Sequence, residues 1–343
     1  MALQIQPFVF DCPSRRGSPW PALKMTAKRY RASGISPVDG LTLLFFHCIG
    51  SHKEQWEPVI AYLFSQSQPS SLDHFKIREA WSFDWPTHGE AGVLNRELLE
   101  QRTDSVSVYD WVPGVVQFLR SRHMQGHRVV LCGHSAGAGT AVHAAAEFYP
   151  NLASAGITRL ILIESTLITR ELFNENFEDR MSQMEFAITA TSSRKDRWKS
   201  RQDASLYFQK RFPWSMWDPR ALRSYVEHGL YDLEDGTVAL KCDKKREAEG
   251  YPDVDPHFEG TIRLGELCHA IPVHVVWGTR NDLVPDFIQD ALSDASEGRP
   301  MTSVTKVKRA GHLIVQEQPI GLAQAIRDIL ETIPSFSVER SKL

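Results

Sequence analysis

Cysteine is scarce in this sequence, and a surplus of positive charge is absent. Only five cysteines occur among 343 residues, and they are Cys12, Cys48, Cys132, Cys242 and Cys268. They form no Cys-x-x-Cys pair and no Cys/His cluster, so we expect a reducing compartment, no disulfide framework and no zinc site. The formal net charge is −3. This charge argues against a protein that binds nucleic acid or membrane surfaces, since such proteins carry a basic surplus.

Long hydrophobic runs are also missing. No apolar run approaches the roughly 20 residues of a membrane-spanning helix, so we expect no membrane span. The first residues, MALQIQPFVFDCPSRRG, lack the basic start and apolar core of a secretory signal peptide. The hydrophobic share of 42% and the charged share of 24% are ordinary for a globular protein with a sizeable core.

The last three residues match a targeting signal. The chain ends in Ser341-Lys342-Leu343, and a terminal Ser-Lys-Leu is the tripeptide that the peroxisomal import receptor reads. The sequence therefore predicts a peroxisomal protein with that receptor as a partner.

Short apolar runs alternate with longer helix-like segments along most of the chain. The runs predict buried strands at 41–48, 77–84, 128–135, 159–165 and 273–278, and a final strand is expected at 303–310. The segments between them predict helices at 53–66, 105–122, 137–148, 286–295 and 319–332. This order indicates a doubly wound α/β sheet with right-handed crossovers. The alternating segment 25–32 indicates an early antiparallel edge strand.

One interval interrupts this alternation. More than a hundred residues separate the strand that ends at Ser165 from the strand that starts near Val273, which is too many for an ordinary connection. The interval is rich in methionine and aromatic residues at helical spacing. We therefore expect a helical cap over residues 166–265, inserted into a core domain made of residues 1–165 and 266–343.

A serine between two glycines stands at the end of the third of these runs. In RVVLCGHSAG, Gly133 and Gly137 stand two residues either side of Ser135, where a strand should become a helix. A tight strand-to-helix turn strains the serine backbone and excludes a Cβ from its flanks. This pattern is typical of the G-x-S-x-G nucleophile elbow, which exposes the serine hydroxyl above the sheet.

A serine nucleophile needs a base and an acid that orients the base. His312, in RAGHLIVQEQP, lies on a loop after the last predicted strand and is the candidate base. Asp282 follows the strand 273–278 and Glu164 lies at the end of the strand 159–165, and both are candidate acids; we favour Asp282, and Glu164 stays the alternative. The oxyanion would be held by two backbone amides. One is that of Ala136, and the other is that of Ile49 or, as second choice, Cys48.

Five motifs in order resemble those of the α/β-hydrolase fold superfamily. They are FFHCIGSHKEQW, DWPTHGEAG, GHSAG, WGTRNDLVP and GHLIVQEQP. The resemblance extends from about residue 25 to residue 333 and implies a mostly parallel, eight-stranded sheet with an inserted cap. Cys48 stands where this family usually has glycine. Segment 215–242 and the terminal Ser-Lys-Leu resemble a narrower group, the fungal peroxisomal α/β-hydrolases of toxin and polyketide biosynthesis, some of which hydrolyse acyl-CoA thioesters.

These observations predict a serine hydrolase that cleaves an ester or thioester of a hydrophobic acyl substrate through an acyl-enzyme, without a cofactor. The candidate substrate-binding residues are His47, His134, Met181, Met184 and Trp214. The basic run RKDRWKSR, residues 194–201, is either a solvated face or a site for the phosphates of an acyl-CoA. Two alternatives remain: an acyltransferase or cyclase that uses the same acyl-enzyme, and a non-catalytic binding protein on a hydrolase scaffold.

Overall fold

The computed structural model describes residues 2–34, 37–67 and 75–333. The C-terminal tripeptide of the import prediction lies outside the described residues. Among those residues, no helix combines the length and the apolar character that crossing a bilayer requires.

An eight-stranded sheet forms the centre of the molecule, in the order β1-β2-β4-β3-β5-β6-β10-β11. Strand β2 is antiparallel to both of its neighbours, β1 and β4, and all other neighbouring strands of this sheet are parallel, so the predicted mostly parallel α/β sheet is confirmed. The strands are β1 (Leu3–Cys12), β2 (Leu23–Ala32), β3 (Leu41–Phe46), β4 (Ile77–Phe83), β5 (Arg128–His134), β6 (Ile157–Ile163), β10 (Val273–Gly278) and β11 (Ser303–Val307).

The edge of the sheet differs from the prediction. Strand β2 contains the segment 25–32, but β1 lies outside it and pairs with it over ten residues. The sequence signal of β1 is weak because Pro7 interrupts it and because most of its side chains are exposed. An edge strand tolerates proline, since only one side of its backbone is hydrogen-bonded to a neighbour.

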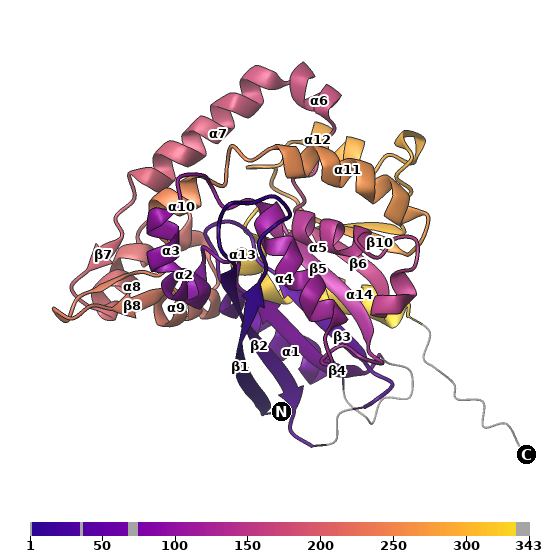
Figure 1. Cartoon of the computed structure of the whole chain (residues 1–343), viewed down its shortest axis with the longest axis horizontal. Coiled ribbons are helices and arrows are strands. Elements are labelled where there is room, and N and C mark those ends of the chain that lie inside the picture. The colour runs from indigo at the N-terminus through magenta and orange to yellow at the C-terminus, as the bar shows by residue number, and fades with distance from the viewer. Residues whose placement is uncertain (1, 35–36, 68–74, 334–343) are drawn as a thin grey trace, which may run out of the picture.

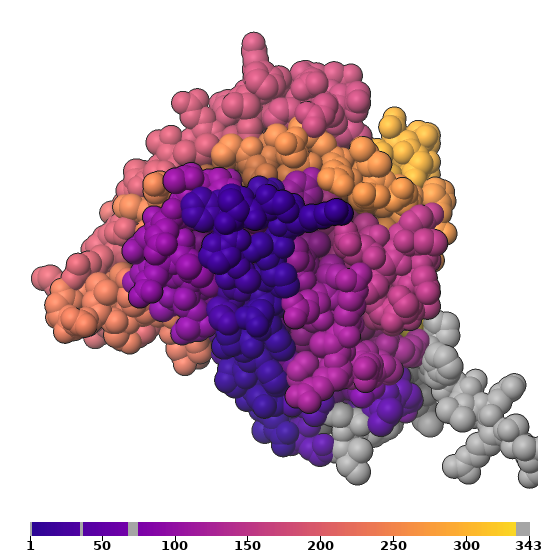
Figure 2. Space-filling model, viewed as in Figure 1, coloured from indigo at the N-terminus to yellow at the C-terminus, as the bar shows by residue number. Residues whose placement is uncertain are grey.

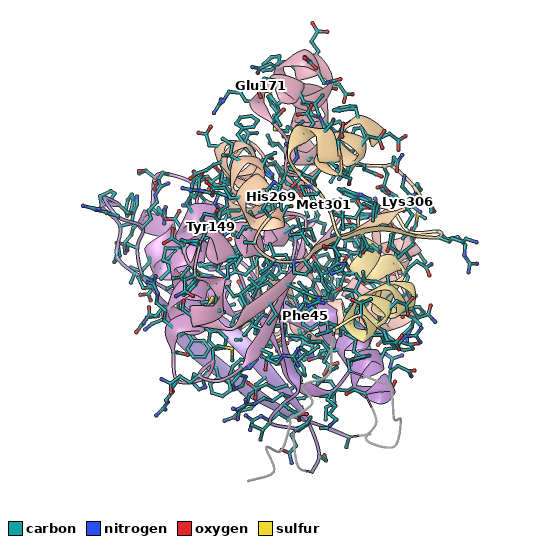
Figure 3. The ribbon with its side chains drawn as sticks, turned by 90° about the vertical axis from the view of Figure 1, so that its right-hand side faces the viewer. Phe45, Tyr149, Glu171, His269, Met301 and Lys306 are labelled. Carbon is teal, nitrogen blue, oxygen red and sulfur yellow. The ribbon has the colours of Figure 1, made fainter. Side chains whose placement is uncertain are left out.

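Helices cover both faces of the sheet (Figure 1). One apolar core includes side chains of α4 (Val108–Arg120), α5 (Ala136–Ala146), α11 (Asp255–Cys268) and α12 (Asp286–Leu292). The core of the other face includes α1 (Glu57–Gln66), α13 (Ile314–Glu317) and α14 (Pro319–Glu331). Phe45 of β3 belongs to this second core and lies deep inside the molecule (Figure 3). Short helices complete the core domain: η1 (Lys53–Trp56), α2 (Gly89–Leu94), α3 (Arg96–Gln101), η2 (Leu152–Ala155) and η4 (Ala295–Glu297).

The interval predicted as a cap occupies the top and the left side of the molecule as it is viewed in Figures 1 and 2. Its helices are α6 (Arg170–Glu175), α7 (Phe177–Ser192), α8 (Arg201–Gln209), η3 (Trp214–Met216), α9 (Pro219–His228) and α10 (Lys244–Ala248). Glu171 of α6 lies far from Phe45 of the sheet, at the top of the molecule (Figure 3). The interval has an aromatic core of its own that includes Trp198, Phe208 and Tyr225.

Two features of this interval were not predicted. It also contains a small antiparallel sheet of β7 (Arg197–Trp198), β9 (Val238–Leu240) and β8 (Leu230–Asp232). Strands of two or three residues are too short to leave a periodic signal in the sequence. The expected boundary at 265/266 falls inside α11, and this helix packs on the core: Leu264 and Leu267 are buried there, and the carbonyl of Pro256 lies 2.8 Å from Nε2 of His143 on α5.

Candidate active site

Ser135 lies on a sharp turn between β5 and α5. Its backbone has φ 55° and ψ −119°, a left-handed conformation that side chains disfavour and that is typical of functional sites. A Cβ on Gly133 would overlap the carbonyl oxygen of Gly137, and a Cβ on Gly137 would overlap that of Phe46. Both glycines are therefore required by close backbone contacts, as the G-x-S-x-G pattern predicts.

The same contact places the start of α5 against the loop that follows β3. A Cβ on Gly137 would also come within 2.7 Å of the carbonyl oxygen of His47, so the first turn of α5 packs backbone to backbone on this loop. Neither Ala136 nor Ile49 nor Cys48 donates its amide to another described residue. The amides predicted for the oxyanion site are thus unpaired and lie on adjoining segments.

Two buried imidazoles fix the conformation of the loop after β3. Nε2 of His47 accepts a hydrogen bond from the amide of Trp85 at 3.1 Å, so its Nδ1 carries the proton and donates to the carbonyl of Cys48 at 2.7 Å. Nε2 of His88 accepts from the amide of Gly50 at 3.0 Å. Burial lowers the pKa of His47 to about 4, so this imidazole is neutral at physiological pH. His47, a predicted substrate-binding residue, is therefore engaged in holding the loop.

The thiol of Cys48 is buried in this loop. Burial raises its pKa to about 12. A nucleophilic cysteine needs a lowered pKa and access to its substrate, so the geometry favours Ser135 as the nucleophile.

His312 lies between β11 and α13, with a carboxylate at its ring. Oε2 of Glu164 is 3.3 Å from Nδ1 of His312. Glu164 follows β6 directly, has a φ of 47° and is 2% exposed. Its other oxygen, Oε1, accepts a hydrogen bond from the amide of Gly278 at 2.5 Å. Both oxygens of this buried carboxylate are hydrogen-bonded, so Glu164 is held rigidly against the imidazole.

Asp282, the favoured acid of the sequence analysis, contacts the backbone of His312 instead of its ring. Its Oδ1 accepts from the amide of His312 at 2.7 Å, and its Oδ2 is 3.1 Å from the guanidinium of Arg280. A Cβ on Gly311 would overlap Oδ2 of Asp282, so this close approach requires glycine there. The structure therefore brings the alternative acid, Glu164, to the imidazole. The reason is sheet order, because β6 lies next to β5 and its end adjoins the turn that carries Ser135.

The elbow and the histidine loop are tied together by the residue before Ser135. Nε2 of His134 is 2.7 Å from the carbonyl oxygen of His312, and the centroids of the two rings are 5.3 Å apart. Burial holds the pKa of His134 well below its usual range, so this ring is neutral and donates to that carbonyl. His134 thus has a structural contact where a substrate contact was predicted. Among the described residues, no hydrogen bond joins the Ser135 hydroxyl to the His312 ring; such bonds often tighten only when substrate is bound.

The predicted cap residues have different environments. Met184 of α7 packs against the main core, whereas Met181 is 42% exposed. Trp214 packs in the aromatic core of the cap, with its ring centroid 4.9 Å from that of Phe208. The structure therefore places Met184 toward the core domain and gives Trp214 a packing role within the cap.

The basic run 194–201 is committed to contacts within the protein. Arg194 forms two hydrogen bonds with Glu247, at 2.6 and 2.9 Å, and Arg201 donates to the carbonyl of Val226 at 2.8 Å. Lys195 lies over the ring of Tyr207. These contacts account for three of its five basic side chains, and they favour a structural role over a phosphate site. Within the described ranges, no cluster of three or more His, Cys, Asp or Glu residues is placed to bind a metal ion.

Glu247 was missed in the sequence. Its Oε1 would lie 2.8 Å from a Cβ on Gly50, which has a φ of 76°. The buried Arg194–Glu247 pair therefore abuts the loop after β3, next to the unpaired amides. No local motif marks this glutamate, because its contacts are with residues far away in the sequence.

Comparisons with solved structures show the same fold in hydrolases of several kinds. The peroxisomal alpha-beta-hydrolase Lpx1 from Saccharomyces cerevisiae superimposes with a TM-score of 0.71 at 17% identity, covering 99% of this chain and 93% of that chain. The M. tuberculosis esterase Rv0045c gives 0.61 at 21% identity, with coverages of 95% and 92%. The thioesterase domain from the curacin biosynthetic pathway gives 0.63 at 14% identity, with coverages of 95% and 99%.

Sequence comparison identifies the family. No curated protein matches the chain significantly. The model of the alpha/beta hydrolase family, however, matches residues 43–325. This range includes the turn at Ser135, both carboxylates and His312. The chain therefore belongs to the alpha/beta hydrolase family.

Proposed function

We propose that the protein is a serine hydrolase that cleaves an ester or thioester of a hydrophobic acyl substrate through an acyl-enzyme. Ser135 is the nucleophile, His312 the general base and Glu164 the acid that orients it. The observation that carries this proposal is the buried carboxylate of Glu164, 3.3 Å from Nδ1 of His312. A carboxylate at Nδ1 leaves Nε2 free to accept the proton of a nucleophile.

The reaction follows from these positions. Nε2 of His312 takes the proton of Ser135 while Oγ bonds to the substrate carbonyl carbon, whose oxygen becomes an oxyanion. The amides of Ala136 and Ile49, or Cys48 in place of Ile49, donate to that oxygen. Collapse breaks the bond to the leaving alcohol or thiol, which receives the proton from His312. A water then repeats the sequence on the acyl-enzyme and releases the carboxylic acid.

Asp282 has a different role in this proposal. By accepting from the amide of His312, its carboxylate positions the backbone of the histidine loop. Arg280 holds that carboxylate in place and is itself bound by both oxygens of Glu317, at 2.7 Å each. Asp282 is thus a positioning residue that acts through His312.

Covalent labelling tests the proposal and separates it from the reading as a binding protein. Incubation with a fluorophosphonate is expected to add one inhibitor mass per chain, located on Ser135 by peptide mass spectrometry. Acyl-CoAs and aryl esters, tested in the same way, are expected to give a transient acyl adduct on the same residue. A label on another residue, or no label on folded protein, would contradict the proposal.

We propose a peroxisomal location from the terminal tripeptide and from the resemblance to fungal peroxisomal hydrolases. The same resemblance suggests a role in secondary metabolism, with acyl-CoA thioesters as one substrate class. The chain fused behind a fluorescent protein is expected to co-localise with a peroxisomal marker in yeast. Removal of residues 341–343 should leave the fluorescence diffuse, because the receptor reads an exposed C-terminus. Unchanged punctate fluorescence after this deletion would show that the tripeptide is not the targeting signal.

A further inference from the structure

Helix α7 spans the region above the candidate active site. Near its start, the guanidinium of Arg180 lies 6.0 Å from the ring centroid of Phe287, which follows the loop of Asp282. At its end, Thr191 lies against the half-buried Tyr251, whose surroundings include Glu247 and Cys48. Figure 1 shows α7 running from above α12 to α10. The helix therefore extends from the histidine side of the site to the loop with the unpaired amides.

One face of α7 points toward the core domain. Residues 180, 183, 184, 187 and 188 are half-buried and Thr191 is buried, whereas the other residues of this helix between 177 and 190 are exposed. This spacing of three and four residues defines a single helix face. Met184 on this face packs against the main core. This face of α7 is therefore turned toward the core domain, which carries the candidate active site.

Two polar side chains of this face have buried atoms without hydrogen-bond partners. They are Nε of Arg180 and Oε1 of Gln183. The Arg180 side chain is only 13% exposed, and its nearest carboxylate oxygen, on Asp179, is 3.8 Å from Nε, which is beyond hydrogen-bond distance. The Nε group is therefore withdrawn from water without a hydrogen-bond partner, which is costly for part of a charged group. By contrast, Arg194, whose Nε is also unpartnered, donates its Nη groups to Glu247 at 2.9 and 2.6 Å.

We propose that Arg180 binds a carboxylate at the far end of the substrate's acyl chain, so that the preferred substrates are half-esters or half-thioesters of dicarboxylic acids. This inference rests on the proposed function for its placement of the scissile carbonyl. The planar edge of a guanidinium matches the two oxygens of a carboxylate. The apolar side chains of Met184 and Ile188 on the same face suit the methylene chain between the two ends.

A single negative charge fits the surroundings better than a phosphate. Arg180 is the one basic residue among the inward positions of α7, and the neighbouring Asp179 would repel a second negative charge. Oε1 of Gln183 is an acceptor and does not bind a carboxylate, so it is left for a hydrogen-bond donor on the ligand. The inferred site therefore selects a monoanionic acyl group.

Paired substrates test this selection. The wild-type kcat/KM for 4-nitrophenyl hydrogen adipate is expected to exceed that for the neutral methyl 4-nitrophenyl adipate by at least about tenfold, one well-placed charge-assisted pair being worth that much. In Arg180→Met this ratio should fall to about one, with the rate on the neutral ester changed less than about threefold. Arg180→Lys should retain part of the preference. Arg223→Met, at an exposed position of α9, is the matched control and should keep the wild-type ratio.

Binding to a non-hydrolysing variant separates this inference from the proposed function. Calorimetry with Ser135→Ala should show monophenyl adipate binding at least about tenfold more tightly than methyl phenyl adipate, and this difference should vanish in Ser135→Ala/Arg180→Met. If esters are cleaved at Ser135 but neither ratio depends on Arg180, the inference is wrong and the proposed function stands. If Arg180 controls binding but Ser135 is not acylated, the proposed function is wrong and the role of Arg180 in binding a carboxylate stands. Tighter binding of the phosphonate of equal length would overturn the choice of a carboxylate.

Discussion

Replacement of Ser135 by alanine is expected to lower kcat for ester hydrolysis by about 10⁵- to 10⁶-fold, as loss of a serine nucleophile does elsewhere. Without Oγ no acyl-enzyme forms, and only the oxyanion donors and substrate binding remain to accelerate attack by water. Initial rates with a 4-nitrophenyl ester check this result. Calorimetric titration with a ligand gives the concentration of binding-competent enzyme in each preparation. The variant should also resist fluorophosphonate labelling.

The backbone at Ser135 provides a control for folding. Alanine has a Cβ like serine, so Ser135→Ala keeps the strain of φ 55° and should unfold at nearly the wild-type temperature. Ser135→Gly removes the strain and should be more stable by about 1–3 kcal/mol, although equally inactive. Thermal unfolding of the three proteins separates these effects. Turnover by Ser135→Ala within tenfold of wild type would exclude Ser135 as the nucleophile.

Local signals made the elbow and the sheet predictable. Contacts within a few residues and with one neighbouring strand leave no room for a Cβ at Gly133 and Gly137. The spacing of these two glycines in the sequence therefore indicates the turn directly. The inner parallel strands β3, β5 and β10 are buried on both faces and appear as continuous apolar runs. Strand β1 carries neither signal, because it is exposed at the edge and contains Pro7.

Distant contacts decided what the sequence left open. Glu164 and Asp282 both follow strands, and spacing cannot tell which carboxylate meets the ring of His312. The structure distinguishes them through the amide of Gly278, which holds Glu164, and through the missing Cβ of Gly311, which admits Asp282 to the backbone. Arg180 has no motif at all. It is noticeable only because its buried Nε lacks a partner, which a sequence does not display.

Replacement of Glu164 by glutamine is expected to lower kcat about 10⁴-fold, as loss of the triad carboxylate does in other serine hydrolases. Two effects add. The amide cannot stabilise the imidazolium that forms when His312 takes the Ser135 proton. Glutamine also needs to keep its oxygen on the amide of Gly278, which turns its NH₂ group toward Nδ1 and favours the wrong tautomer of the ring. Steady-state rates on one ester, with near-wild-type thermal unfolding, check this.

Replacement of Asp282 by asparagine is the matched comparison and should cost less than about tenfold. The asparagine oxygen can still accept from the amide of His312, and Arg280 keeps its two hydrogen bonds to Glu317, so the histidine loop retains its position. Replacing the charged acceptor of this hydrogen bond by a neutral one costs about 1 kcal/mol, which corresponds to less than a tenfold loss in rate. Equal losses in Glu164→Gln and Asp282→Asn would contradict the division of roles, and a larger loss in Asp282→Asn would restore Asp282 as the acid. Because the two carboxylates contact the same histidine at different atoms, this pair of substitutions separates orientation of the ring from placement of its backbone.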